Sequence, residues 1–202
     1  MSSTRTAGRQ YLVAVRSMVI FTVVLGVAYT LLITGIGQLF MPWQANGSTV
    51  KAGDSVVGSA LIGQSFTDAD GNALPEWFQS RPSAAGDGYD ASASSGSNLG
   101  PDNADLVTAI NDRRDAIASL DGVDPDSIPA DALTASASGL DPHISPEYAQ
   151  EQVSRVAEAR GISEDKVEAL VVSATQARDL GYLGELTVNV LRLNIALAAL
   201  AG

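Results

Sequence analysis

The chain has 202 residues, a formal charge of −11, 46% apolar residues, one histidine and no cysteine. The charge is unevenly distributed. Arg5, Arg9 and Arg16 are the only charged residues before Lys51, so the first 50 residues carry +3 and the remaining 152 carry −14. An acidic bulk repels phosphate backbones, which argues against nucleic acid as a partner. The lack of cysteine excludes a disulfide framework, a thiolate metal site and a cysteine nucleophile.

An uncharged apolar stretch follows the arginines. Met18 to Phe40 consists mostly of Val, Leu, Ile, Ala, Gly and Thr, and a helix of about 20 such residues spans a bilayer. We predict a transmembrane helix over residues 17–40. The alternative is a cleavable signal peptide, which would need a shorter apolar stretch and a cleavage site of small residues. Bulky side chains occupy residues 39–43 instead, and this favours a retained anchor.

The arginines also predict the orientation of the span, because positively charged flanks are retained in the cytoplasm. Residues 1–16 are therefore expected to be cytoplasmic, and residues 41–202 are expected to form an extracytoplasmic domain. Trp43 and Tyr11, at opposite ends of the apolar stretch, suit the two membrane interfaces.

A stripe of small side chains runs along the predicted span, with Thr22, Gly26, Thr30 and Thr34 four residues apart. Such stripes let helices approach closely and let hydroxyl groups bond across to a partner. Alternatively, each threonine bonds the carbonyl four residues before it within its own helix. Spacing alone does not separate the two interpretations. We treat these four residues as candidates for contact with a partner helix.

The first part of the predicted domain contains few helix signals. Val56, Val57, Leu61, Ile62 and Phe66 lie around two glycines, and this pattern favours a short strand or two with a tight bend over residues 55–66. Residues 69–103 are rich in Gly, Asp and Ser, a composition typical of a flexible loop.

Three helices are predicted next. Asp102 or Asn103 can cap the first, which ends at Gly122. The second runs from Ser145–Pro146 to Gly161. The third begins at Ser163 and continues to Gly181, with Leu180 on its apolar face. The tail over residues 188–200 fits a strand or a helix equally well. The expected class is α+β, with one transmembrane helix followed by a single helix-rich domain.

Catalytic motifs are scarce in the sequence. No phosphate-binding loop, dinucleotide fingerprint or nucleophile elbow is present. The single histidine cannot supply a zinc site, which usually needs two or more. We therefore expect no metal, no cofactor bound by a motif and no catalytic centre.

His143 and Asp141 are the closest approach to catalytic chemistry. They could act as an acid–base pair, but they lie two residues apart just before a helix start, which favours a structural turn. Arg81 could bind a carboxylate of a partner or close an internal ion pair, and the second is the commoner case.

Several segments together resemble the KdpC family, the C subunit of the Kdp-type potassium-transporting ATPase. They follow the family's order along the chain and differ from it at only a few positions, such as Trp77, Ala137 and Leu186. The segments are Gly58–Phe66 (GSALIGQSF), Trp77–Ser83 (WFQSRPS), Ser95–Gly100 (SGSNLG), Thr134–Pro146 (TASASGLDPHISP), and LGE with VNVL over residues 183–191.

The resemblance implies an accessory subunit in the bacterial plasma or inner membrane. Its partners would be a potassium-channel-like subunit and an ATP-hydrolysing P-type subunit. The family is described as a catalytic chaperone that raises the ATP affinity of the hydrolysing subunit in a ternary complex. ATP is thus implied only through that complex, because an extracytoplasmic domain cannot touch cytoplasmic nucleotide.

The resemblance also changes how two loops are interpreted. Residues 77–83 and 95–100 are expected to be ordered, and Arg81 and Asn98 within them are candidates for a partner interface. Two other functions stay open: a membrane-anchored hydrolase that uses Asp141 and His143, and a cell-envelope binding module.

Overall fold

The computed structural model describes residues 4–200, with side chains from residue 8 onward. The chain divides into two compact units, residues 1–48 and residues 49–202. Residues 41–48, which were predicted to belong to the domain, are grouped with the apolar helix. Arg5 is predicted to flank the span, and its side chain lies outside the described part.

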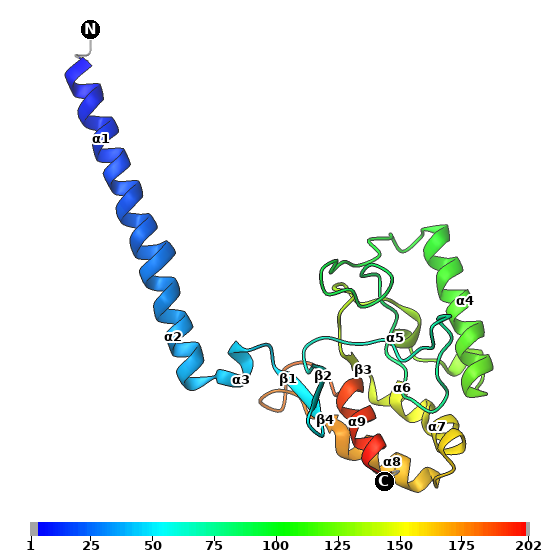
Figure 1. The fold of residues 1–202 in the computed structure, drawn as a ribbon. Helices are drawn as coiled ribbons and strands as arrows, with labels where there is room; N and C mark the ends of the chain where they lie inside the picture. The colour runs from blue at the N-terminus through cyan, green and yellow to red at the C-terminus, as the bar shows by residue number, and fades with distance from the viewer. Residues whose placement is uncertain (1–3, 201–202) are drawn as a thin grey trace. The chain divides into compact units, whose positions relative to one another are not determined.

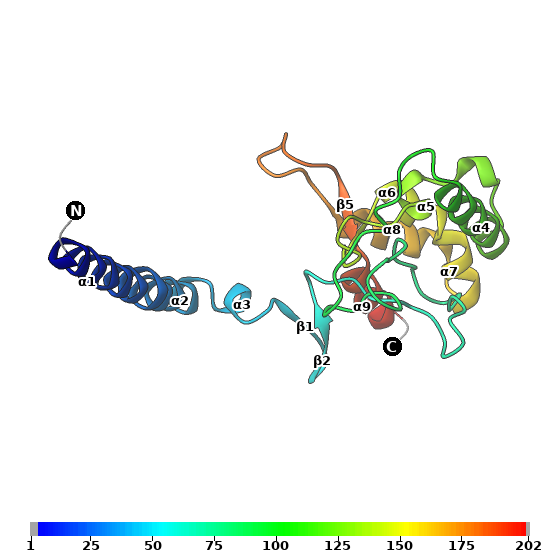
Figure 2. The ribbon, with the colours of Figure 1, turned by 90° about the horizontal axis from the view of Figure 1, so that it is seen from above.

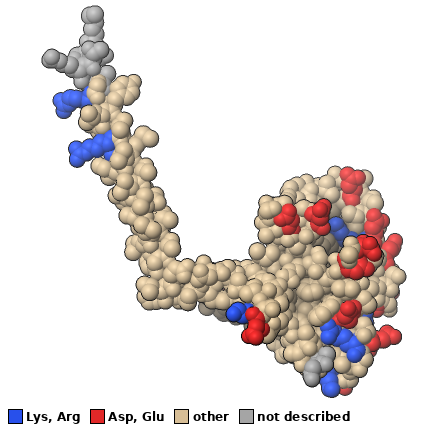
Figure 3. Space-filling view, viewed as in Figure 1, with Lys and Arg blue, Asp and Glu red and all other residues tan. Residues whose placement is uncertain are grey.

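The first unit is an apolar helix with a short helical turn after it (Figure 1). Residues Gly8–Phe40 form a helix long and apolar enough to cross a membrane. Figure 3 shows Lys and Arg near its start, and the sequence has no charged residue from Ser17 to Val50. Its parts are α1 (Thr4–Phe21), the π-helix η1 (Thr22–Tyr29), α2 (Thr30–Phe40) and α3 (Pro42–Ala45).

The long helix ends at Phe40, two residues before Pro42. Met41 leaves helical geometry with φ −137° and ψ 51°, and Pro42 takes the first position of α3. This placement is favourable because the ring has no N–H to leave unpaired. Asn46 then closes the turn by donating from Nδ2 to the Pro42 carbonyl at 2.6 Å.

The second unit combines two small antiparallel sheets with helices. One sheet pairs β1 with β2, and the other has the order β3-β5-β4. Within the second sheet, His143 lies opposite Asn189 and Thr175 opposite Val188. The strands are β1 (Thr49–Ala52), β2 (Ser55–Ser59), β3 (His143–Ile144), β4 (Thr175–Gln176) and β5 (Thr187–Asn189).

The helices of this unit follow the long loop that comes after β2 (Figures 1 and 2). They are α4 (Ala104–Asp121), the 3-10 turn η2 (Pro125–Ser127), α5 (Ala130–Leu133), α6 (Pro146–Glu151), α7 (Val153–Arg160), α8 (Glu164–Ala174) and α9 (Val190–Leu200). The mixture of helix and strand confirms the α+β class.

The core lies among α6 to α9 and β5. Val156, Val167, Val188, Leu193 and Leu197 are fully buried, and burial of apolar surface of this kind is the main driving force for folding. Phe78, which comes from the long loop, is also fully buried in this cluster. The loop is therefore anchored to the domain by packing.

Several predicted boundaries are confirmed. Asn103 caps α4 by accepting from the Asp105 N–H, and Gly122 ends the helix in the left-handed region with φ 68°. Ser145 caps α6 by accepting from the Tyr148 N–H, with Pro146 directly after it. The ambiguous tail contains both structures, because β5 ends at Asn189 and α9 begins at the next residue.

The third predicted helix was too long. It ends at Ala174, and Thr175 turns into extended geometry to pair with β5. Leu180 was assigned to the apolar face of this helix, yet it lies in a loop with φ 54° and is 80% exposed. Apolar spacing alone could not reveal that a strand would take residues 175 and 176.

The other two corrections are smaller. The helix predicted from Ser145 to Gly161 is interrupted at Gln152, where ψ is −9°, and forms α6 and α7. Within residues 55–66 only β2 is a strand. Its partner β1 lies upstream, so the bend falls at Gly53, outside the predicted range.

Candidate functional site

The candidate site is centred on Asp141 and Arg81, which come from two loops. Arg81 Nη1 donates to Asp141 Oδ2 at 3.0 Å, and Arg81 Nη2 donates to the Thr134 carbonyl at 3.2 Å. Tyr89 donates its hydroxyl to the Arg81 carbonyl at 2.6 Å. Burial raises the pKa of Tyr89 to about 12, so the phenol stays a neutral donor. The structure thus places Arg81 in an internal ion pair.

Asp141 also bonds to His143. The His143 N–H donates to Asp141 Oδ1 at 3.0 Å, and His143 Nδ1 lies 3.4 Å from the same oxygen. Burial raises the pKa of Asp141, but the bonds from His143 and Arg81 outweigh it, so the pKa lies below its usual value. The carboxylate therefore stays ionised and acts as the acceptor that joins both loops.

The segment Gly58–Phe66 meets this site at a glycine. Gly63 N–H donates to the Leu140 carbonyl at 2.9 Å. A Cβ at Gly63 would lie 2.3 Å from the Tyr89 ring and 2.7 Å from the Asp141 carbonyl oxygen. No side chain fits at that separation, so the close approach of these loops requires glycine.

The C-terminal segment meets the site through a strand and an amide. Asn189 lies opposite His143 in the sheet, and its Nδ2 donates to the Ala60 carbonyl at 2.9 Å. The Val190 N–H donates to the Pro142 carbonyl at 3.0 Å. Residues 188–191 thereby join the two loops that meet at Gly63.

The segment Ser95–Gly100 packs against the same region. The Ser95 N–H donates to the Ser138 carbonyl at 2.9 Å, and Ser83 Oγ donates to the Gly139 carbonyl at 2.6 Å. Asn98 is exposed with φ 53°, and its Nδ2 donates to the Gly96 carbonyl. Its predicted contact with a partner subunit remains a prediction.

All five segments that carry the family resemblance contribute to one connected cluster, which we call the hub. It comprises residues 58–66, 77–83, 95–100, 134–146 and 188–191, and residues 185–187 border it across a hollow. Two open hollows flank its central ion pair. One of about 500 Å³ is lined by Asp131, His143, Glu147 and Glu185, among others, and one of about 600 Å³ by Leu61, Ile62, Ser138 and Pro142, among others.

Ser145 carries the hydroxyl group nearest in sequence to the candidate acid–base pair of Asp141 and His143. This hydroxyl is already hydrogen-bonded to other groups. Ser145 Oγ donates to Asp131 Oδ1 at 2.8 Å and accepts from the Tyr148 N–H at 3.0 Å. The Ser145 hydroxyl proton is therefore directed to Asp131, not to His143. A serine nucleophile activated by His143 would need that hydroxyl to point elsewhere.

Buried polar residues that were not among the predicted site residues hold the loop 75–83 in place. Asn194 accepts from the Phe78 N–H at 3.0 Å and donates to the Phe78 carbonyl at 2.9 Å. Arg155 binds the Asp121 carboxylate and donates to the Trp77 carbonyl at 3.0 Å. Burial raises the pKa of Asp121, and Arg155 offsets only part of that effect. The sequence signal for such residues is a polar side chain among the apolar positions of a helix, as at Asn194 in α9 and Arg155 in α7.

The predicted stripe on the span is divided between two helix types. Thr22 and Gly26 lie in the π-helix η1, and Thr30 and Thr34 lie in α2. All four are exposed, and a Cβ at Gly26 would meet only the Thr22 methyl at 3.9 Å. Contact with a partner helix remains a prediction.

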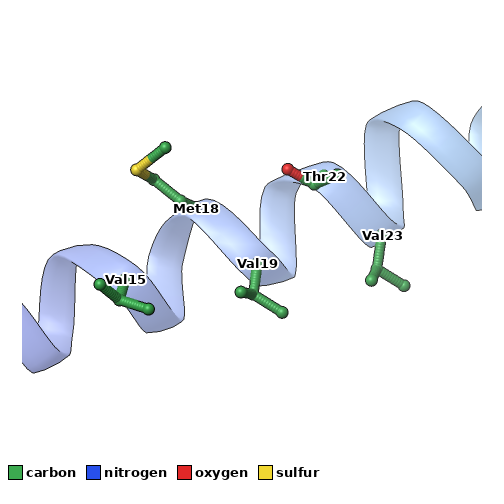
Figure 4. Close-up of a pocket in the computed structure, with 5 residues that line it drawn as sticks. All are labelled: Val15, Met18, Val19, Thr22 and Val23. Atoms are coloured by element: carbon green, nitrogen blue, oxygen red, sulfur yellow. The ribbon is translucent and has the colours of Figure 1, made fainter.

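A shallow groove of about 340 Å³ lies beside the start of the stripe. Figure 4 shows Val15, Val19 and Val23 pointing to one side of the helix, and Met18 and Thr22 pointing away from them. Apart from the Thr22 hydroxyl, the side chains that line the groove are apolar. This is expected for a helix surface that contacts lipid or another helix.

These features define a class of protein: an acidic domain of mixed helix and strand that follows an apolar helix long enough to span a membrane. The Asp141 carboxylate of the candidate site is used for internal bonding. A family model described as "K+-transporting ATPase, c chain" matches residues 11–199. The chain belongs to the KdpC family.

Curated relatives agree with this assignment over most of their length. The chain is 52% identical over 184 residues to a potassium-transporting ATPase KdpC subunit of Kineococcus radiotolerans, with 91% of the chain and 90% of the relative covered. It is 51% identical to one of Mycobacterium tuberculosis, covering 94% and 97%. It is 54% identical to one of Caulobacter vibrioides, covering 92% and 91%. The resemblance predicted from the sequence segments is confirmed.

Proposed function

We propose that the chain is a non-catalytic accessory subunit of a high-affinity, ATP-driven potassium uptake complex. The observation that carries this proposal is the family match across residues 11–199, together with a site whose charged groups bind one another. In this proposal the chain assembles with a channel-like subunit and a P-type ATP-hydrolysing subunit and stabilises both. The relatives' shared name, which places them in a potassium-transporting ATPase, supports the partners.

The proposed anchor is the helix Gly8–Phe40, with the N-terminus in the cytoplasm and the acidic domain outside. The support is the position of Arg5, Arg9 and Arg16 before the span and the lack of charge from Ser17 to Val50. Protease added to intact spheroplasts is expected to digest the domain. Protection of the domain would contradict this orientation.

We further propose that the chain raises the ATP affinity of the hydrolysing subunit without touching nucleotide. Such an effect would pass through partner conformations that the domain contacts differently in each state. Its support is the orientation proposed above, because an extracytoplasmic domain and cytoplasmic ATP lie on opposite sides of the membrane.

Co-purification tests the accessory role directly. An affinity-tagged chain, extracted in mild detergent, is expected to bring down a multi-span channel-like protein and a P-type ATPase. A chain that purifies alone and hydrolyses a substrate would contradict the proposal. The hydrolase alternative gains no support from the site, because Ser145 bonds to Asp131 and Asp141 bonds to Arg81.

A further inference from the structure

The loop between β4 and β5 projects from the domain as an exposed hairpin (Figure 2). We call residues 177–186 the finger, and every one of them is exposed. Four of its large apolar side chains face solvent: Leu180 at 80%, Tyr182 at 70%, Leu183 at 49% and Leu186 at 48% exposure. Exposed apolar side chains clustered in this way mark a surface that contacts a membrane, another protein or a ligand.

The finger is held in shape by its own backbone. The Asp179 N–H donates to the Leu183 carbonyl and the Leu183 N–H donates to the Asp179 carbonyl, both at 2.9 Å. Gly181 and Tyr182 also donate to carbonyls within the turn. Much of the backbone at the tip is thus hydrogen-bonded internally. Peptide groups need such internal bonds wherever water cannot bind them.

Leu180 at the tip has φ 54°, a left-handed conformation that a leucine rarely adopts. This geometry carries its side chain outward at 80% exposure instead of folding it onto the domain. The apolar side chain is therefore displayed at the cost of an unfavourable backbone conformation.

The charges near the tip are largely compensated. Arg178 Nη2 lies 2.6 Å from Glu185 Oε2, so an ion pair closes the base of the hairpin. The remaining charge is Asp179. In a region of the chain that carries −14 overall, the finger is a nearly neutral apolar projection with a tyrosine beside its leucines.

We infer that the finger inserts its leucines and tyrosine into the surface of the lipid bilayer that holds the chain's own N-terminal helix. Residues 41–48 connect the helix to the domain. They include the helical turn α3, and even if fully extended they would reach at most about 29 Å. A domain of this size has a radius of gyration of about 15 Å. The covalent link therefore keeps the domain, of which the finger is an exposed part, close to the bilayer.

The composition of the finger fits this occupant. Tyrosine is favoured at the membrane interface, and leucine is favoured in the acyl region below it. A second apolar contact beside a covalently attached span is strengthened by the high local concentration of membrane. The acidity of the domain favours zwitterionic lipid over anionic lipid. The inference rests on the proposed membrane anchoring.

The chain has no cysteine, so single reporters can be placed without removing native residues. Leu180→Cys and Tyr182→Cys each receive an environment-sensitive fluorophore. Asp112→Cys on α4, which Figure 2 shows on the far side of the domain from the finger, is the matched control. Val24→Cys in the span reports the anchor.

The full chain is reconstituted in phosphatidylcholine vesicles with and without lipid that carries a spin label. The complete complex in nanodiscs of the same lipids is measured in parallel. Labels at residues 180 and 182 are expected to shift to shorter wavelength and to be quenched by spin-labelled lipid in both preparations. The label at residue 112 is expected to show neither change.

The two proposals fail separately in this experiment. Quenching at residue 24 without quenching at residues 180 and 182 overturns the inference about the finger and leaves the anchor in place. Loss of quenching at residue 24 overturns the anchor and the inference together. A blue shift at residue 182 in the complex without lipid quenching shows that a protein partner covers the finger, which also overturns the inference.

The leucines themselves provide a further control. In the Tyr182→Cys chain, the added changes Leu180→Ser and Leu183→Ser remove most of the apolar tip. Lipid quenching at residue 182 is expected to fall toward the level at residue 112. Unchanged quenching would show that the attached fluorophore, and not the finger, enters the bilayer.

Discussion

The hub and the finger use their side chains in opposite ways. In the hub, irregular loops are fixed because polar groups bond to one another, as Arg81 does with Asp141 and Thr134. In the finger, the backbone is paired internally, and the apolar side chains of Leu180 and Tyr182 are left in solvent. The comparison indicates that the hub maintains the architecture of the domain, whereas the finger is available for contact with something outside it.

Gly63→Ala should give the largest effect on the hub. Its Cβ would lie 2.7 Å from the Asp141 carbonyl oxygen, and backbone cannot move aside cheaply. We expect a loss of about 1–3 kcal/mol or more in the free energy of unfolding, as for overpacked cores. Chemical unfolding of the full chain measures it. Gly100→Ala, where no atom lies within 4 Å of the added Cβ, is the control and should be nearly neutral.

Arg81→Gln should have the next largest effect, because it leaves Asp141 without its cation. We expect a loss of about 1–3 kcal/mol in the free energy of unfolding, the range for an unsatisfied partly buried group. A double-mutant cycle with Asp141→Asn measures the coupling between the two side chains. Additive single effects would contradict the role given to this ion pair.

The ion pair of Arg81 and Asp141 predicts that the free energy of unfolding depends on pH. The folded pKa of Asp141 lies below the usual value of 3.8, so its contribution to stability is present above that value. It is lost as the pH falls through the folded pKa. Asp141→Asn should therefore reduce the loss of stability on acidification.

Glu151 should make the free energy of unfolding depend on pH in the opposite direction to Asp141, and Glu151→Gln tests this. Burial, together with the charges of Asp121 and Asp131, raises the pKa of Glu151 to about 7, and one carboxylate oxygen is buried without a hydrogen-bond partner. The folded state therefore loses stability as the pH rises from about 4.5 to 7. The variant should flatten this decline, as thermal unfolding at several pH values would show. An unchanged pH profile would contradict it.

Gly26→Leu should leave the domain unaffected and weaken only subunit association. A large side chain in the stripe blocks close helix approach, while the helix keeps its apolar character for insertion. Co-purification of partner subunits measures this, with Gly35→Leu, which lies off the stripe, as the control. Equal recovery of partners with both variants would show that the stripe faces lipid.

The sequence predicted local punctuation better than long-range pairing. Asn103, Gly122 and Ser145 set helix ends through bonds within a few residues, so the pattern alone revealed them. The end of α8 at Ala174 depends on β5, which lies more than ten residues further along the chain. Apolar spacing could not foresee that competition, and Leu180 was assigned to a helix face for the same reason.

The candidate site shows the same division. The Asp141 and His143 neighbourhood was visible because both residues lie in one short segment. The convergence of Gly63, Tyr89 and Asn189 on that segment depends on tertiary approach. The family resemblance marked these segments as important, but only the folded chain shows that they touch.

The central claim, that the Asp141 and His143 region is structural, is tested most directly by His143→Gln in the assembled complex. Glutamine keeps a donor and an acceptor but cannot exchange a proton near neutral pH. Potassium-stimulated ATP hydrolysis is expected to stay near the rate of the unmodified complex. A fall of about 10²–10⁴-fold, the usual contribution of general acid–base catalysis, in a variant that still assembles would contradict the account.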